Sequence, residues 1–126
     1  LSLGTMTYPA MGAAEILEKE GISLAVVNAR FAKPLDEDMI LKYAGSGRVV
    51  FTAEEGVVPG GFGSSVREFL DNSGLMNVRF KQIGLPLEIY PVGKVDQIKK
   101  KYRLDTDGLA EQVRDFFSKE KRQKAL

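Results

Sequence analysis

A glycine-rich stretch is the first feature of this chain that could do chemistry. Gly60-Gly61-Phe62-Gly63-Ser64-Ser65 follows an apolar run and precedes a helical pattern, so its backbone N–H groups and the helix dipole could hold a phosphate. The specific fingerprints fail, because Val66 stands where a dinucleotide motif has its third glycine and no lysine follows as in a P-loop. We therefore favour a tight turn with a serine cap and keep phosphate binding as the alternative.

Four charged residues are expected to lie beside this stretch. Glu54 and Glu55 are adjacent on a predicted strand, so their side chains point to opposite faces and do not form an acid/base pair by themselves. Arg30 and Lys33 follow another predicted strand. We expect one of the glutamates to form an ion pair with Arg30 or Lys33 that pins two neighbouring strand ends together.

The composition excludes most catalysis by side chains. The chain has no cysteine and no histidine, which excludes Ser-His-Asp and Cys-His triads, zinc-protease helices, disulfides and cysteine metal sites. We expect no catalytic, cofactor-binding or metal-binding residue here, so the chain does not carry a complete active site of its own.

Charge and hydropathy disfavour nucleic acid and membrane as partners. The formal net charge is +1, and no apolar run approaches the roughly 18–20 residues that span a bilayer. Lys99, Lys100, Lys101 and Arg103 form a basic cluster, but the apolar spacing beside them assigns it to the solvated face of a short helix, without aromatic residues for base stacking. No signal peptide is visible, and a cytoplasmic location is the default.

The elements that must position these residues alternate between strand and helix. Apolar runs predict strands at 1–5, 22–29, 48–53 and 78–83, the last of them half-wet and at an edge, with helical periodicity between and after them. This alternation predicts an α/β fold with a mostly parallel sheet layered by helices. Since ligands and partners meet such a sheet beyond the carboxyl ends of its strands, we expect segments 5–8, 30–34 and 54–65 to converge there.

The chain reads as one domain, residues 1–126, without an internal repeat. Leu109, Val113, Phe116 and Phe117 repeat along the last helix, and the two phenylalanines are expected in the core. Apolar partners are lost after Ser118, so we expect an ordered core of about 1–118 and a frayed tail at 119–126. Because the sequence begins within a strand pattern, we expect a domain cut from a larger enzyme.

Several short motifs, in this order and spacing, resemble the C-terminal domain of transketolase-like enzymes. They are Gly4-Thr5-Met6 with Tyr8-Pro9-Ala10, Glu20-Gly21-Ile22, Val27-Asn28-Ala29-Arg30-Phe31 with Lys33-Pro34-Leu35-Asp36, Glu54-Glu55-Gly56 and Gly60-Gly61-Phe62-Gly63-Ser64. Within that superfamily, Ile83-Gly84-Leu85-Pro86 and Leu104-Asp105 with Gly108-Leu109 are most similar to the 1-deoxy-D-xylulose-5-phosphate synthases. The resemblance extends from about residue 3 to about residue 117.

The resemblance implies a three-layer fold around a mixed sheet of about four to five strands, with helices on both faces. It also implies a parent enzyme that condenses pyruvate with glyceraldehyde 3-phosphate and releases carbon dioxide, for isoprenoid, thiamine and pyridoxal synthesis. In that family thiamine diphosphate and a divalent cation, usually magnesium, are held by two preceding domains, through a Gly-Asp-Gly motif that this chain lacks. The C-terminal domain packs against those domains and contributes to a homodimer.

On this resemblance, the candidate site residues serve architecture and domain contact. They are Arg30, Lys33, Glu54, Glu55, Gly60, Gly61, Phe62, Gly63 and Ser64. Two positions depart from the family pattern, since Leu87 replaces a common Asp and Val92 a common His or Gln. Two other functions stay open: a freestanding phosphate- or nucleotide-binding regulatory module, and a separate C-terminal subunit of a split transketolase.

Overall fold

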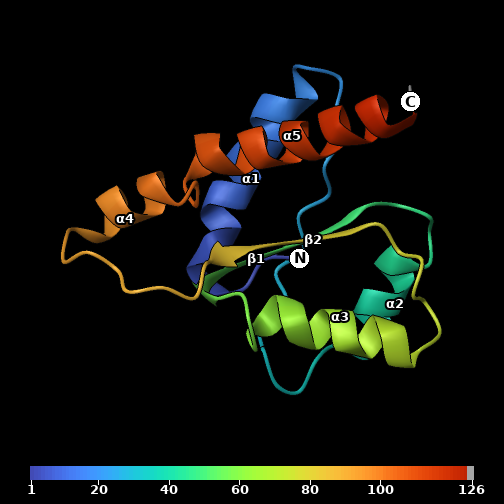
Figure 1. The fold of residues 1–126 in the computed structure, drawn as a ribbon. Helices are drawn as coiled ribbons and strands as arrows, with labels where there is room; N and C mark the ends of the chain where they lie inside the picture. The colour runs from blue at the N-terminus through green and yellow to red at the C-terminus, as the bar shows by residue number, and fades with distance from the viewer. Residues whose placement is uncertain (125–126) are drawn as a thin grey trace.

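The computed structural model describes residues 1–124 and shows a parallel strand layer between two layers of helices (Figure 1). In chain order the elements are η1 (Gly4–Met6), α1 (Thr7–Glu18), α2 (Glu37–Ala44), β1 (Val50–Val57), α3 (Phe62–Asn72), β2 (Phe80–Leu85), α4 (Val95–Lys101) and α5 (Thr106–Lys124). The expected three-layer α/β architecture is therefore confirmed.

The strand layer is built around β1. Strand β2 pairs with it in parallel, in a register that runs from Val50 opposite Phe80 to Ala53 opposite Ile83. On the other side of β1, Ser2 forms parallel bridges both to Ala53 and to Asn28. The spatial order is therefore 26–29, 1–3, β1 and β2, which puts β2 at an edge as expected.

The strand count differs from the expected four to five. Only β1 and β2 form a continuous ladder, segments 1–3 and 26–29 contribute isolated bridges, and the pairings among the described residues are all parallel rather than mixed. The expected strand at 22–29 was wrong in its extent, since this segment contributes only a bridge at Asn28, and Ser23, Ala25 and Asn28 are exposed. Within the described residues, Ser2 bridges Asn28, in the second half of this segment.

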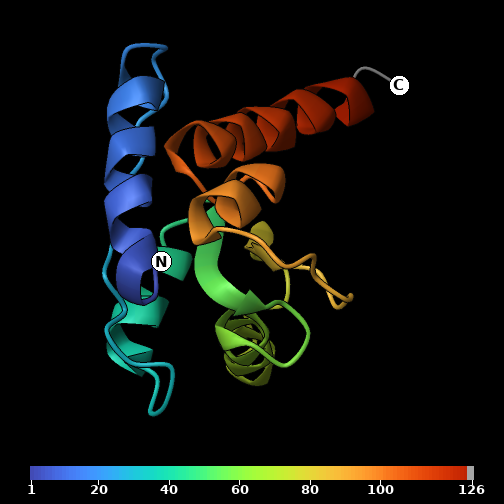
Figure 2. The ribbon, with the colours of Figure 1, turned by 90° about the vertical axis from the view of Figure 1, so that its left-hand side faces the viewer.

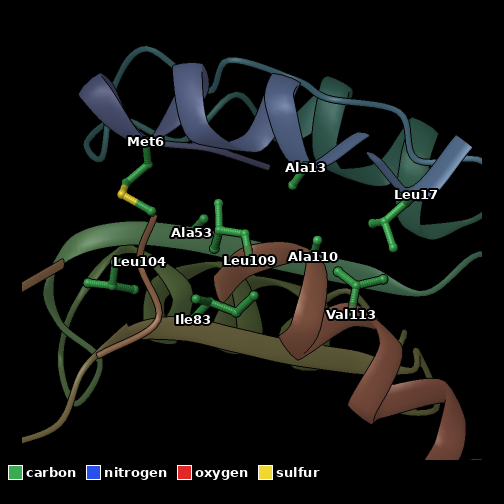
Figure 3. Packing of buried hydrophobic residues seen from close by; sticks show 9 residues of the cluster. All are labelled: Met6, Ala13, Leu17, Ala53, Ile83, Leu104, Leu109, Ala110 and Val113. Carbon is green, nitrogen blue, oxygen red and sulfur yellow. The ribbon is translucent and has the colours of Figure 1, made fainter. Parts of the chain in front are cut away.

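Two apolar clusters fix the helices to opposite faces of this layer. One cluster joins α1 and α5 to the strands and includes Met6, Leu17, Ala53 and Val113, which point into the same space in Figure 3. The second joins α2 and α3 to the other face around residues such as Ile40. Figure 2 shows the same separation, with α1 and α5 on one side of β1 and α3 on the other.

The helix starts follow local hydrogen bonding. Asp36 caps α2, because its carboxylate accepts a hydrogen bond from the N–H of Met39 at 3.0 Å. Met6 occupies the N-cap position of α1 and makes no side-chain capping hydrogen bond, while the Thr7 hydroxyl lies 3.0 Å from that of Ser2. Ser2 is buried, and its hydroxyl also donates to the carbonyl of Val27 at 3.2 Å, so its hydrogen-bonding capacity is satisfied inside the domain.

Arg103 joins α4 to α5 and is more than a solvated cation. Its backbone is left-handed (φ 59°), and its carbonyl accepts a hydrogen bond from Gln112 at 3.0 Å. Its guanidinium binds Asp115 at 2.8 Å and Glu111 at 3.2 Å. Gly108 permits this turn, because a Cβ there would lie 2.4 Å from the Cα of Arg103.

Helix α5 is continuous to Lys124, beyond the point near residue 118 where the sequence predicted fraying. The part of that prediction that concerns residues 125–126 lies outside the described residues. Phe116 and Phe117 are half-buried rather than fully buried, and both contact Phe51, with ring centroids 5.3 Å and 6.4 Å away. Among the described helices, none combines the length and apolar character that crossing a bilayer requires.

Replacing Leu17 by alanine tests the packing of α1 on the strand layer. Leu17 is 0% exposed, so Leu17→Ala is expected to lower the free energy of unfolding by about 2–5 kcal/mol through lost apolar burial and a residual cavity. Leu87→Ala is the matched control, because Leu87 is 77% exposed and the change should stay within about 0.5 kcal/mol. Urea unfolding measures both, and equal effects would contradict this packing.

Candidate functional site: a carboxylate at the start of helix α3

Glu54 lies at the centre of the region that the sequence singled out. It is in phase with Val50 and Thr52 on β1, which turns its side chain toward α3, and it is only 4% exposed. Its two carboxylate oxygens accept hydrogen bonds from the backbone N–H groups of Phe62, at 2.9 Å, and Gly63, at 2.8 Å. A buried anion thus satisfies two of the free donors at a helix N-terminus and complements the helix dipole.

The glycines of this region allow the close approach of the Glu54 carboxylate. A Cβ on Gly61 would lie 2.3 Å from Glu54 Oε2, and one on Gly84 would lie 3.0 Å from Glu54 Cγ. A Cβ on Gly63 would lie 2.4 Å from the buried Oγ1 of Thr52. Gly61 at the cap of α3 and Gly84 on β2 therefore leave room for the Glu54 side chain, and Gly63 allows α3 to approach Thr52 of β1.

The loop before α3 is held by Ser64, though not in the expected way. The helix begins at Phe62, with Gly61 as its cap and no capping hydrogen bond from a serine side chain, so the predicted serine cap was wrong. Instead, the Ser64 hydroxyl donates to the carbonyl of Val58 at 2.6 Å and accepts from the N–H of Gly60 at 3.2 Å. Gly60 has φ 74°, a left-handed conformation that favours glycine.

This arrangement bears directly on the phosphate alternative. A phosphate at a helix N-terminus needs free backbone N–H groups, and those of Phe62 and Gly63 already donate to Glu54. A second anion at this position would also lie against a buried carboxylate. The geometry therefore gives the glycine-rich loop an internal, structural ligand.

Glu55 points to the opposite face, as predicted for adjacent strand residues. Its carboxylate accepts a hydrogen bond from the Thr5 hydroxyl and forms an ion pair with Lys99 of α4. The hydrogen bond from Lys99, followed by that from Thr5, holds the pKa of Glu55 below its usual value. The stabilisation from this carboxylate is present above the unfolded-state pKa and is lost as the pH falls through the lower folded-state pKa.

The predicted ion pair between a glutamate and Arg30 or Lys33 was wrong. Glu54 binds backbone N–H groups, Glu55 pairs with Lys99, and neither Arg30 nor Lys33 has an ion pair within residues 1–124. Both cations are exposed. The left-handed Arg30 (φ 58°) donates its N–H to Asn28 Oδ1 at 3.0 Å, which is a local turn interaction.

Sequence reasoning missed two partners of the site. Lys99 was assigned to a solvated helix face together with Lys100 and Lys101, but its side chain is 23% exposed and reaches Glu55. Thr52 is fully buried against α3, and its hydroxyl has no hydrogen-bond partner among the described residues. The alternation along β1 could have found Thr52, whereas the position of Lys99 depends on where the loop after β2 places α4.

The two positions that depart from the family pattern lie in an exposed apolar segment, residues 87–95. Leu87 is 77% exposed and Val92 is fully exposed, as is Ile89 between them. The segment is held to the rest of the domain by a hydrogen bond that the Tyr102 hydroxyl donates to Glu88. This hydrogen bond is the main reason why the pKa of Tyr102 is raised to about 12. The apolar side chains themselves are left facing outward.

Comparison with known proteins identifies close similarity in sequence and in structure. Residues 1–109 match the family model described as "Transketolase, C-terminal domain". The chain is 43% identical, over 92% of its length, to 1-deoxy-D-xylulose-5-phosphate synthase 1 of Geobacter metallireducens, and 39% identical, over 88%, to the synthase of Halothermothrix orenii. It spans only 19% and 18% of the lengths of these curated relatives.

A solved structure described as "Split gene transketolase, inactive beta4 tetramer" shares the fold. It superposes on this chain with a TM-score of 0.81 at 30% sequence identity. The similarity covers 93% of this chain and 38% of that one. Both comparisons thus align this chain with one part of a longer polypeptide.

The adjacent glutamates provide a matched test of the site. Glu54→Gln replaces one acceptor oxygen by an amide donor that faces a backbone N–H, so the free energy of unfolding is expected to fall by about 1–3 kcal/mol. Glu55→Gln removes a part-exposed ion pair with Lys99 and keeps an acceptor oxygen for the Thr5 hydroxyl, so it should cost at most about 1 kcal/mol. Urea unfolding at neutral pH compares them, and a larger loss for Glu55→Gln would show that the capping carboxylate is misassigned.

A phosphate titration tests the alternative use of the glycine-rich loop. For a site with a dissociation constant of about 10 μM, phosphate is added at about 100 times that concentration. We expect no change in Tm, because the N–H groups at the start of α3 already donate to Glu54. True binding at that affinity would stabilise the fold by about 2.7 kcal/mol. A matched concentration of sodium chloride controls for ionic strength, and a rise specific to phosphate would restore the alternative.

Proposed function

The chain belongs to the transketolase C-terminal domain family, and on this premise we propose that it is the non-catalytic C-terminal domain of a 1-deoxy-D-xylulose-5-phosphate synthase. The observation that carries the proposal is the pair of hydrogen bonds from the start of α3 to Glu54, which gives the chain's best candidate ligand site a structural role. Synthases of this kind are also the relatives that match nearly the whole chain.

In this proposal the complete enzyme condenses pyruvate with glyceraldehyde 3-phosphate and releases carbon dioxide, supplying precursors for isoprenoids, thiamine and pyridoxal. The domain packs against the thiamine-binding domains of the same polypeptide and supports their assembly as a homodimer in the cytoplasm. Its contribution to the reaction is to hold those domains in place, because a small displacement of reacting groups costs about a hundred-fold in rate.

The donor set of this chain does not fit thiamine diphosphate or its magnesium ion. Magnesium needs oxygen ligands gathered around one point, and residues 1–124 contain no group of three or more acidic side chains with that arrangement. The N–H groups at the start of α3, which could have met a diphosphate, donate to Glu54. We therefore assign the cofactor and the metal ion to the rest of the synthase.

The candidate site residues divide into two roles under this proposal. Glu54 and the loop from Gly60 to Ser64 are internal architecture, because their polar groups are hydrogen-bonded within the domain. Arg30 and Lys33 are exposed and without an ion pair among the described residues, which suits contact with a neighbouring domain.

A separate C-terminal subunit of a split transketolase is the second candidate. The solved structure with a TM-score of 0.81 is described as a split gene transketolase, so this fold does occur in an enzyme divided between genes. That candidate requires the domain to act without a covalent connection to the thiamine-binding part. The two candidates can therefore be distinguished by comparing this domain fused to the thiamine-binding part with the same domain added as a separate protein.

A domain replacement tests the proposed function. In the Geobacter metallireducens synthase, which is 43% identical to this chain over the matched part, the C-terminal segment is exchanged for this chain. With thiamine diphosphate and magnesium, the chimera is expected to regain synthase activity within about tenfold of the intact enzyme, whereas the truncated enzyme should fall by about a hundred-fold. Product formation from pyruvate and glyceraldehyde 3-phosphate measures it.

Two controls complete this experiment. The chain alone should show no turnover, and measurable turnover would overturn its non-catalytic role. The chain added in trans to the truncated enzyme should restore little, while full restoration would favour the split-subunit candidate. A chimera that folds and dimerises but is no more active than the truncated enzyme would refute the proposed domain role.

A further inference from the structure

The outer edge of strand β2 carries backbone groups that no other described segment pairs with. Val50 N–H donates to Arg79 O, and Val50 lies opposite Phe80 in the parallel register. In such a ladder alternate residues turn both backbone groups to the same side, so the odd-numbered residues of β2 face β1 and the even-numbered residues face outward. The outward groups make no backbone hydrogen bond within residues 1–124. They belong to Phe80, Gln82 and Gly84.

A groove of about 290 Å³ lies along this edge, between β2 and α5. Val113 of α5 faces the core, and Arg114 pairs with Glu20 of α1 at 2.6 Å. The opposite flank of α5 therefore overhangs the open side of β2, while Figure 1 shows α3 on the other face of the strand layer. The groove is lined by Lys81, Arg103, Gln112, Asp115, Phe116 and Lys119.

The groove carries an excess of positive charge. Arg103 is neutralised, because it pairs with Asp115 at 2.8 Å. Lys81 and Lys119 are both exposed and form no ion pair within the described part of the chain. Among these residues Asp115 is the one acidic side chain that lines the groove. Two cations are therefore left to face an incoming group.

The alternation along β2 specifies the side chains of a strand added to it. Phe80 packs against the α2 and α3 cluster, whereas Ile83 belongs to the α1 and α5 cluster, so Lys81 shares the α5 side. Directly opposite residues of an antiparallel pair share a face. An added strand would thus place every second side chain in the groove, where a carboxylate meets Lys81 and Lys119. The side chains between them would lie near Phe80, where apolar residues or threonine fit.

Charge also selects between possible occupants of this edge. Two copies of this chain paired at β2 would gather Lys81 and Lys119 from both copies along one seam, and like charges opposite one another are destabilising. Lysine on an edge strand is a common protection against such self-pairing. An acidic strand is instead attracted by the same charges, which speed its encounter and fix its register.

We propose that this edge binds an extended, acidic segment of another polypeptide, which adds an antiparallel strand opposite residues 80–84 and sets Asp or Glu side chains against Lys81 and Lys119. The three outward residues span roughly 13 Å at the spacing of a strand. Main-chain hydrogen bonds to them supply affinity, as in other domains that bind a peptide at a sheet edge, and the lysines supply selectivity. This binding does not depend on the proposed synthase role, because it uses only groups of this domain.

Three blocked peptides test the proposal. The probe is acetyl-Thr-Glu-Val-Glu-Val-Glu-Thr-amide. Replacing its glutamates by lysine reverses the charge, and N-methylating its valines removes the N–H groups that an antiparallel partner of Gln82 needs. We expect the probe at about 1 mM to slow hydrogen exchange of the Phe80, Gln82 and Gly84 amides about tenfold, which corresponds to a dissociation constant of about 100 μM. Neither of the other peptides should protect these amides.

A charge reversal in the chain provides the matching variant. Lys81→Glu combined with Lys119→Glu should weaken binding of the probe at least about tenfold and should allow the lysine peptide to bind instead. The control is Lys19→Glu combined with Lys42→Glu, which changes the net charge equally at two exposed positions outside the groove. It should bind the probe like the unchanged chain. Surface changes of this kind leave stability almost unaltered.

Four outcomes would overturn the proposal. They are no protection by the probe, equal protection by the lysine peptide, equal protection by the N-methylated peptide, and equal weakening by the two double variants. Protection of the same amides that grows with the concentration of the chain, without any peptide, would assign the edge to a second copy and overturn it as well. Because no turnover is measured, failure here is distinct from failure of the domain replacement.

Discussion

The hydrogen bonds from the start of α3 to Glu54 are the interaction on which the other features of this domain depend. They tie the carboxyl end of β1 to the helix that carries one apolar cluster, and so fix which face of the strand layer α2 and α3 cover. They also explain Gly61, since a side chain there would collide with the carboxylate, and a Cβ on Gly84 would lie only 3.0 Å from the Cγ of Glu54. A buried anion is stable here because two donors and a helix dipole compensate it.

Most of the architecture could be predicted from sequence, because it follows from short-range patterns. Helical periodicity placed α1, α2 and α5, and the order of the elements predicted the parallel layer with helices on both faces. The extent of the strand within residues 22–29 could not be predicted, because an apolar run does not show which of its residues pair with a neighbouring strand.

The candidate site, too, could be predicted only in part. Opposite orientations for Glu54 and Glu55 follow from strand alternation, and the phase shared with Val50 and Thr52 could have identified Glu54 as the inward member. The hydrogen-bond and ion-pair partners of these two glutamates could not be predicted from the residues near them in the sequence. Lys99 reaches Glu55 only because α4 returns to the end of β1. The donors at the start of α3 are backbone N–H groups, which every residue except proline has, so the amino-acid types there do not reveal them. Charge complementarity alone favoured Arg30 and Lys33, which the fold keeps apart from both glutamates.

The position of segment 1–3 has a consequence for how the domain is made. Segment 1–3 lies between two segments that follow it in the chain, with Ser2 bridged to Asn28 and Ala53. Their backbone partners on β1 do not exist until residue 53 has been synthesised, and β1 itself needs β2. Such sequence-distant parallel pairing is slow to form. Segment 1–3 therefore stays without its β1 partners until those later residues have been synthesised, and unpaired strand edges of this kind are prone to aggregation and are protected by chaperones.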